Sequence, residues 1–182
     1  MERTILILIN GLPATGKTNL AQQIALQTRL PLICKDEIKE LLFDCLGTHD
    51  RDWSRRLGVV SIKLMYFYLD KLLQAGQSAI IESVFDPDFA KKDIQKLKDK
   101  YDFQIVQVFL YADRAIIVER FKQRVHTGSR HKGHVDEANF EMLEEWELEP
   151  IDVPSELIKV DTTYFSQVNF DKLIAKIKSL LK

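Results

Sequence analysis

The segment Gly11–Thr18, with the letters GLPATGKT, constrains the fold of this chain more than any other feature. It follows an apolar run of strand length, Thr4–Ile9, and it leads into residues of helical period that begin at Lys17. Gly11 and Gly16 allow the backbone N–H groups between them to converge on phosphate oxygens. A strand, a glycine-bearing loop and a helix in this order are the context in which the spacing G-x-x-x-x-G-K-T binds a nucleoside triphosphate.

This loop supplies the candidate nucleotide-binding residues. We expect Lys17 to reach the β- and γ-phosphates and the Thr18 hydroxyl to ligate Mg²⁺. The N-terminus of the following helix adds its partial positive charge. An ordinary glycine turn is the alternative interpretation, but the complete motif in this context disfavours it. The expected nucleotide-binding residues of the loop are Gly11, Pro13, Ala14, Thr15, Gly16, Lys17, Thr18 and Asn19.

The rest of the chain alternates apolar runs of strand length with longer segments of helical period. This pattern is typical of an α/β fold with a parallel sheet wrapped by helices. The chain of 182 residues is long enough for one domain, and we expect a single domain over residues 1–182. The expected strands are 4–9, 30–34, 78–83, 103–110 and 157–160. The expected helices are 17–28, 36–45, 54–75, 87–100, 113–126, 136–149 and 170–181.

Composition adds limits on partners and compartment. The net charge of −1 gives no bulk electrostatic reason to expect nucleic acid, although a local basic groove remains compatible with it. Cys34 and Cys45 are the only cysteines, too few for a disulfide framework. The apolar run at the N-terminus is too short to span a bilayer. We therefore expect a reduced, cytoplasmic protein with no membrane partner.

Two classes of nucleotide hydrolase are disfavoured by motifs that the chain lacks. No guanine-reading N-K-x-D occurs, and the D-x-x-G letters of 44–47 end an expected helix instead of following a strand. A motor ATPase needs an apolar strand that ends in Asp-Glu, and 109–113 comes nearest to this pattern. Asp113 is better placed as the cap of the helix that follows. A translation-type GTPase is excluded, and a motor is disfavoured.

Two acidic residues follow or end expected strands. Asp36 comes directly after the second strand, and the carboxyl ends of strands in an α/β sheet face the ligand crevice. Its carboxylate can accept the proton of an acceptor hydroxyl, although it can also cap the next helix; Glu37 is a less suitable substitute. Glu82 ends the third strand and can hold a metal-bound water or an acceptor group, or it can be a solvated strand end. We expect Thr18 and Glu82 on the metal side of the site.

Three arginines indicate a mobile lid over the phosphates. Arg120 and Arg124 are four residues apart and share one helix face, and Arg130 lies in the basic, glycine-bearing segment that follows. Each alone can be a solvated surface charge. Together they favour a lid over about residues 127–135, in which guanidinium groups neutralise the transferring charge and exclude water.

Other basic residues and histidines leave alternatives open. His126, His131 and His134 fit no close zinc template, and we interpret them as polar lid residues. A second set lies between the second and third strands, where it can bind an anionic substrate or be solvated. This set is Arg51, Arg55 and Arg56.

The chain resembles a small P-loop kinase in four features taken together. These are GLPATGKT, KDEI after the second strand, IIESVF at the third strand and the Arg120/Arg124 helix. The most similar group contains chloramphenicol phosphotransferase, the kinase half of polynucleotide kinase, zeta toxins and gluconate kinase-like proteins. Its bacterial members are often labelled AAA family ATPases. The resemblance implies a sheet of order 2-3-1-4-5 and Asp36 as the catalytic base. It also implies that Asp161–Thr163, with Thr162 at its centre, flanks the adenine.

One departure from this group concerns the acceptor. Lys39 stands where polynucleotide kinase has an arginine-rich signature after the base, which disfavours a nucleic-acid substrate. The sequence therefore predicts an ATP- and Mg²⁺-dependent kinase that acts on a hydroxyl of a small molecule. The expected catalytic residues are Asp36, Lys17, Arg120, Arg124 and Arg130. A polynucleotide 5′-hydroxyl kinase and a non-catalytic ATP-binding switch are the alternatives.

Overall fold

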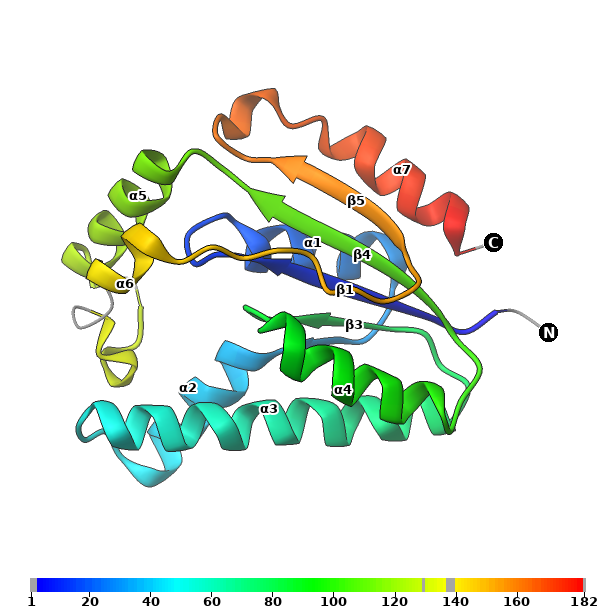
Figure 1. Cartoon of the computed structure of the whole chain (residues 1–182), viewed down its shortest axis with the longest axis horizontal. Coiled ribbons are helices and arrows are strands. Elements are labelled where there is room, and N and C mark those ends of the chain that lie inside the picture. The colour runs from blue at the N-terminus through cyan, green and yellow to red at the C-terminus, as the bar shows by residue number, and fades with distance from the viewer. Residues whose placement is uncertain (1–2, 129, 137–139, 182) are drawn as a thin grey trace.

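Strand β1 (Ile5–Gly11) lies at the centre of a five-stranded parallel sheet with the order β2-β3-β1-β4-β5, as Figure 1 shows for the computed structural model. The structure describes residues 3–128, 130–136 and 140–181. In register, Ile9 lies between Glu82 on one side and Val108 on the other. The expected fold class and strand order are both confirmed. The other strands are β2 (Leu32–Cys34), β3 (Ala79–Glu82), β4 (Gln104–Tyr111) and β5 (Glu156–Asp161).

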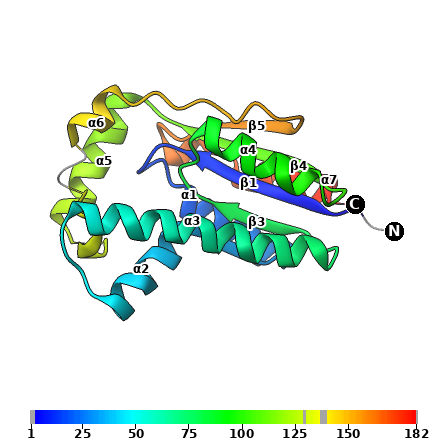
Figure 2. The same cartoon turned by 60° about the horizontal axis from the view of Figure 1, so that its bottom comes forward.

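Helices cover both faces of the sheet and the edge formed by the carboxyl ends of the strands. The α-helices are α1 (Lys17–Thr28), α2 (Lys35–Leu46), α3 (Arg51–Gln74), α4 (Pro87–Lys98), α5 (Arg114–His126), α6 (Phe140–Glu145) and α7 (Phe170–Leu180). Among the described residues, the short 3₁₀ helix η1 (Lys132–His134) follows α5, and η3 (Phe165–Gln167) follows β5. Figures 1 and 2 place α5 and α6 beyond the carboxyl ends of the strands and α3 along one face.

The side chains of β1 divide the core into two layers. Ile5, Ile7 and Ile9 pack with α1 and α7, while Leu6 and Leu8 pack with α3 and α4. Successive side chains of a strand point to opposite faces, so a strand buried on both faces reads as a continuous apolar run. Because the phosphate loop directly follows β1, it lies at the carboxyl edge of the sheet.

Two expected boundaries in the first half of the chain are corrected. Helix α3 begins at Arg51 and not at residue 54, because the Asp50 side chain caps it by accepting a hydrogen bond from the Trp53 N–H at 2.8 Å. Strand β2 begins at Leu32 and not at residue 30, and the carbonyl of Pro31 just before it accepts a hydrogen bond from the Ile80 N–H at 2.8 Å. The shorter loop before α3 brings the start of that helix close to α2.

The expected acidic helix over residues 136–149 is also corrected, since α6 spans only Phe140–Glu145; residues 137–139 lie outside the described part. Pro150 disfavours helical backbone at the residue before it. Beyond Pro150, the amide of the buried Gln107 side chain pairs with the backbone of Ile151. Gln107 Oε1 accepts from the Ile151 N–H at 2.7 Å, and Gln107 Nε2 donates to the Ile151 carbonyl at 3.1 Å. These bonds hold the segment extended across the sheet. Within the described residues, no helix is long and apolar enough to cross a membrane.

Candidate active site

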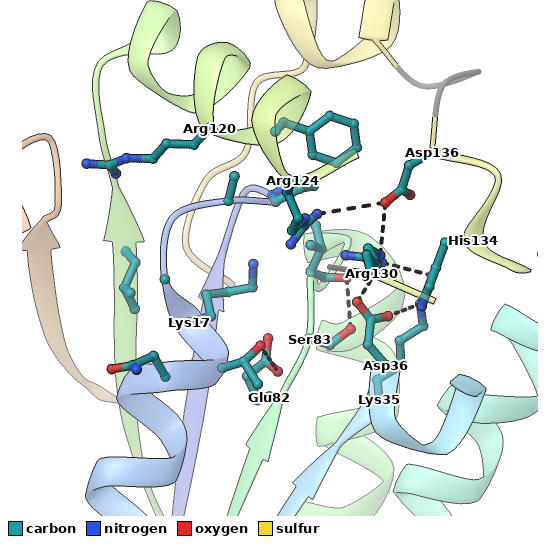
Figure 3. Close-up of a pocket in the computed structure, with 18 of the residues that line it drawn as sticks. Lys17, Lys35, Asp36, Glu82, Ser83, Arg120, Arg124, Arg130, His134 and Asp136 are labelled. Carbon is teal, nitrogen blue, oxygen red and sulfur yellow. Dashed lines mark hydrogen bonds and ion pairs between the residues drawn. The ribbon is translucent and has the colours of Figure 1, made fainter. Parts of the chain in front are cut away.

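A cavity of about 920 Å³ opens at the carboxyl ends of the strands, where a parallel α/β sheet is expected to bind its ligand. The phosphate loop and α1 form its floor, and α2 and α3 form one wall. Helix α5 and the described part of the segment after it close the top (Figure 3). We call residues 130–136 the lid segment. The cavity is therefore bounded by elements from nearly the whole chain.

The phosphate loop has the backbone that its glycines predict. Gly11 and Gly16 have φ angles of 150° and 85°, in the region that favours glycine. At Gly11 a Cβ atom would lie 2.3 Å from the carbonyl oxygen of Leu110, which cannot give way. Ala14 also has a positive φ, 63°, an uncommon conformation for a residue with a side chain. Such local strain concentrates at ligand-binding loops.

Lys17 is buried at the start of α1 and is held by the loop itself. Its Nζ donates a hydrogen bond to the carbonyl of Leu12 at 2.8 Å. Burial lowers the pKa of Lys17 to about 8, against the opposing effects of Glu82 and Asp36. A bound polyphosphate would favour the charged form of the side chain. The residue thus lines the cavity beside the phosphate loop, and its contact with phosphate stays a prediction.

Thr18 and Glu82 meet on the floor of the cavity. The Thr18 hydroxyl donates to Glu82 Oε2 at 3.1 Å, and only 4% of Glu82 is exposed. Burial raises the pKa of this carboxyl, while Lys17 acts to lower it. Hard cations such as Mg²⁺ prefer carboxylate and hydroxyl oxygens. The pair therefore fits the metal-side role expected for both residues, although no group of three or more metal-ligating side chains occurs among the described residues.

Asp36 lies in the first turn of α2 on the cavity wall, with 39% of its side chain exposed. Its two carboxylate oxygens accept from Lys35 Nζ and from an Arg130 NH group, each at 2.8 Å. Burial alone would raise the pKa of Asp36, but Arg130 and Lys35 outweigh burial and hold the pKa well below its usual range. The carboxylate is consequently ionised at neutral pH and available as a hydrogen-bond acceptor.

Arg130 and Arg124 converge on one acidic residue, Asp136. The Arg130 Nε lies 2.9 Å and an Arg124 NH group 3.9 Å from Asp136 Oδ2. Figure 3 shows both guanidinium groups turned toward the cavity between Asp36 and Asp136. The sequence predicts the two arginines as lid residues, but it gives no sign that Asp136 is their common partner, because nothing in the sequence context of Asp136 separates it from other solvated acids.

The lid segment docks on α2 through an aromatic contact. The His131 ring stacks on the Phe43 ring with a centroid distance of 5.2 Å, and His134 meets the same ring edge-on at 5.6 Å. His134 Nε2 also lies 3.0 Å from Glu40 Oε1. At Gly133 a Cβ atom would lie 2.6 Å from the Phe43 ring. The two histidines thus belong to the lid, and their side chains hold it against α2.

Arg120 lies apart from the other two arginines. Its guanidinium donates to the backbone carbonyls of Thr162 and Thr163, both at 2.9 Å, and lies over the Phe165 ring at 4.1 Å. Figure 3 shows the Arg120 side chain turned away from Arg124 and Arg130. It therefore ties α5 to the loop after β5, on the far side of the phosphate loop from Asp36. Thr162, expected beside the adenine, lines this end of the cavity. Phe165, which the sequence analysis missed, covers Gly16 here, since a Cβ atom on that glycine would lie 2.6 Å from its ring.

The opposite end of the cavity is formed by one face of α3. Arg55, Gly58, Val59 and Ile62 have the spacing i, i+3, i+4, i+7, which places them on one helix face. Of the three arginines left open by the sequence, only Arg55 lines the cavity within the described structure. The spacing can be read from the sequence, but Arg55 and Gly58 do not form an apolar stripe with Val59 and Ile62, and only the structure shows that this face borders a cavity.

Comparisons with known proteins agree with this geometry. The AAA domain family matches residues 6–148. The crystal structure of a "putative kinase" from Chloroflexus aurantiacus J-10-fl is 36% identical, with a TM-score of 0.91 over 100% of this chain and 97% of that one. No curated protein matches the sequence.

Two more distant structures share the fold. A sugar kinase from Janibacter sp. HTCC2649 is 18% identical with a TM-score of 0.60, over 97% of this chain and 93% of that one. A gluconokinase from Sinorhizobium meliloti 1021 is 14% identical with a TM-score of 0.55, over 100% and 93%. The family match covers most of the sequence and contains the phosphate loop, Asp36 and the lid arginines. The chain therefore belongs to the AAA domain family, as a small P-loop kinase-like protein.

Proposed function

We propose that the protein transfers the γ-phosphate of ATP, with Mg²⁺, to a hydroxyl group of a small-molecule acceptor. One observation carries the proposal: the Asp36 carboxylate lies on the wall of the same cavity whose floor holds Lys17 and the phosphate loop. A nucleotide switch needs the loop but has no use for an ionised carboxylate opposite it. The kinase descriptions of the structural relatives support the same class of reaction.

The residues divide between the two substrates. The phosphate loop and Lys17 bind the triphosphate, and Arg120 with Thr162 marks the end of the cavity for its base. Bound Mg²⁺, on the Thr18 and Glu82 side, would neutralise charge on the phosphates. The acceptor hydroxyl lies at Asp36, toward the α3 end of the cavity.

In the transfer, the acceptor oxygen forms a bond to the γ-phosphorus as the bond from that phosphorus to the β,γ-bridging oxygen breaks. The proton of the acceptor hydroxyl passes to Asp36, and ADP leaves with the electron pair of the broken bond. Lys17, Arg124 and Arg130 stabilise the charge on the transferring group. The lid segment excludes water, which would otherwise compete as acceptor.

The test uses ATP labelled at the γ-phosphate, a mixed cell extract as the acceptor pool and the variant Asp36→Asn. We expect label among the small molecules with the wild-type protein and a loss of at least roughly 10²-fold with the variant, the lower end of general-base contributions. ATP binding, measured by calorimetry, should persist in Asp36→Asn because the phosphate loop is unchanged.

Three results would redirect the assignment. Label on nucleic acid, with a salt-sensitive rate, would indicate a polynucleotide kinase instead. Tight ATP binding with no transfer to either fraction would favour the non-catalytic switch. Transfer by Asp36→Asn at the wild-type rate would remove Asp36 from the role of base.

A further inference from the structure

Lys39 is a buried cation on the cavity wall that has no carboxylate within ion-pair distance among the described residues. It lies on α2, and only 7% of it is exposed. Its neighbour one turn earlier, Lys35, pairs with Asp36 at 2.8 Å. Burying a charge without a counter-charge is costly, so such groups are uncommon unless a ligand completes them.

The protein contacts of Lys39 position its ammonium group without neutralising it. Nζ donates to the Ser54 hydroxyl at 2.9 Å and lies 5.3 Å from the centre of the Phe43 ring. Burial lowers the pKa of Lys39 to about 8, with Lys35 contributing in the same direction and Asp36 opposing it. The ammonium group has three N–H donors, and one protein acceptor occupies one of them.

Gly58 leaves a notch in the wall of α3 that faces this ammonium group. A Cβ atom at Gly58 would lie 3.8 Å from both Cε and Nζ of Lys39, so the missing side chain opens space beside the charge. Arg55, one turn earlier on α3, brings a second cation to the same end of the cavity. Glycine inside a long helix destabilises it relative to alanine, so the notch has a cost in helix stability.

We propose that the acceptor carries an anionic group in addition to its hydroxyl, and that Lys39 binds this group in the notch at Gly58. This inference rests on the proposed function and adds the class of acceptor to it. Asp36 and Lys39 are three residues apart on α2, so their Cβ atoms are about 5–6 Å apart on one helix face. One small molecule spans them, with its hydroxyl at Asp36, its anionic group at Lys39 and its carbon chain along Val59 and Ile62.

A carboxylate and a phosphate monoester both satisfy this geometry, and matched probes separate them. Binding is measured by calorimetry without nucleotide, using D-gluconate against sorbitol, D-glycerate against glycerol, and glycerol 1-phosphate against glycerol. Transfer from γ-labelled ATP is measured with the same probes. We expect at least one acid to bind tenfold or more tightly than its neutral counterpart.

The variants assign this preference to Lys39. Lys39→Met should remove the preference for the acidic probe without weakening the binding of the neutral probe or of ATP. Lys39→Arg should retain most of this preference. Arg56→Met removes an exposed cation of α3 that does not line the cavity, and it should leave the preference unchanged. Gly58→Ala fills the notch with a residue of higher helix propensity. It should therefore weaken binding of the acidic probe while raising the Tm of the protein.

Equal binding of every acid and its neutral counterpart, or a preference that survives Lys39→Met, would overturn the inference. Weaker ATP binding in Lys39→Met would also overturn it, because Lys39 would then belong to the triphosphate site. Failure of the proposed function looks different: acids would still bind through Lys39, but label would reach neither a probe nor any molecule of a cell extract.

Discussion

Arg130 reaches across the cavity to Asp36, with an NH group 2.8 Å from the carboxylate Oδ2, although the two residues are 94 positions apart in the chain. The lid arginine and the proposed base thus neutralise each other in this structure. Asp136 holds the other side of the guanidinium at 2.9 Å. Arg130 is consequently positioned between the base and the phosphate side of the cavity, where it can pass from one anion to the other.

Replacing Arg130 tests this position directly. Arg130→Met should lower kcat by at least roughly 10²-fold, because arginines that stabilise transferring phosphoryl groups contribute 10³-fold or more in related chemistry. Steady-state transfer from labelled ATP measures the effect. Lys132→Met removes an exposed cation of the same lid segment and should have little effect on kcat. Equal losses in the two variants would indicate a general charge effect and not a specific contact.

Gly133→Ala should release the lid from α2. The new Cβ atom would lie 2.6 Å from the Phe43 ring, so the lid segment or the ring must shift. We expect limited trypsin digestion after Arg130 to accelerate about tenfold, which corresponds to ~1.4 kcal/mol of docking free energy. Gly58→Ala is a matched control, since its Cβ atom has room at 3.8 Å from Lys39. Unchanged cleavage in Gly133→Ala would mean that the lid is not held by this contact.

Arg120→Met should weaken the binding of ATP and leave the binding of the acceptor unchanged. The variant loses two hydrogen bonds to the Thr162 and Thr163 carbonyls and the contact with Phe165. Loss of ~1.4 kcal/mol would raise the Kd of ATP roughly tenfold. Calorimetric titration with ATP gives this value, with the exposed Lys122→Met of the same helix as control. A fall in kcat with an unchanged Kd would place Arg120 with the lid arginines instead.

The acid preference should depend on pH through Lys39, whose pKa is lowered to about 8 by burial. The ammonium form predominates below this pKa, so affinity for an acidic probe is full well below it and falls as pH rises, by roughly fivefold from pH 8 to pH 9. The charged or titratable groups around Lys39 in the cavity are Lys35, Asp36, Arg55, Arg130, His134 and Asp136.

Of these groups, His134 has its pKa lowered to about 2 by burial and so stays neutral over this range. The neutral probes should show no such fall, and neither should Lys39→Arg, because a guanidinium stays charged. Calorimetry at several pH values makes the comparison. The same fall in Lys39→Arg would assign the titration to another group.

The sequence by itself determined the nucleotide half of the site, because this half is local. The strand, the loop Gly11–Thr18 and α1 are contiguous, and their function depends on backbone geometry that two glycines permit. The carboxyl-end positions of Asp36 and Glu82 also followed from the order of strands and helices, since parallel strands end at one edge of a sheet. The alternation of apolar runs likewise predicted the α/β class.

Only the tertiary structure decided the half of the cavity that we propose for the acceptor. Asp136 becomes the partner of Arg124 and Arg130 through contacts between segments that are distant in sequence. Lys39 is buried between α2 and α3, and no carboxylate of the described residues lies within ion-pair distance of it. Arg120, which shares a helix face with Arg124, turns instead to the loop after β5. The spacing of residues along the sequence predicts which side chains share a helix face. Packing between elements that are distant in sequence decides which charged groups those side chains contact.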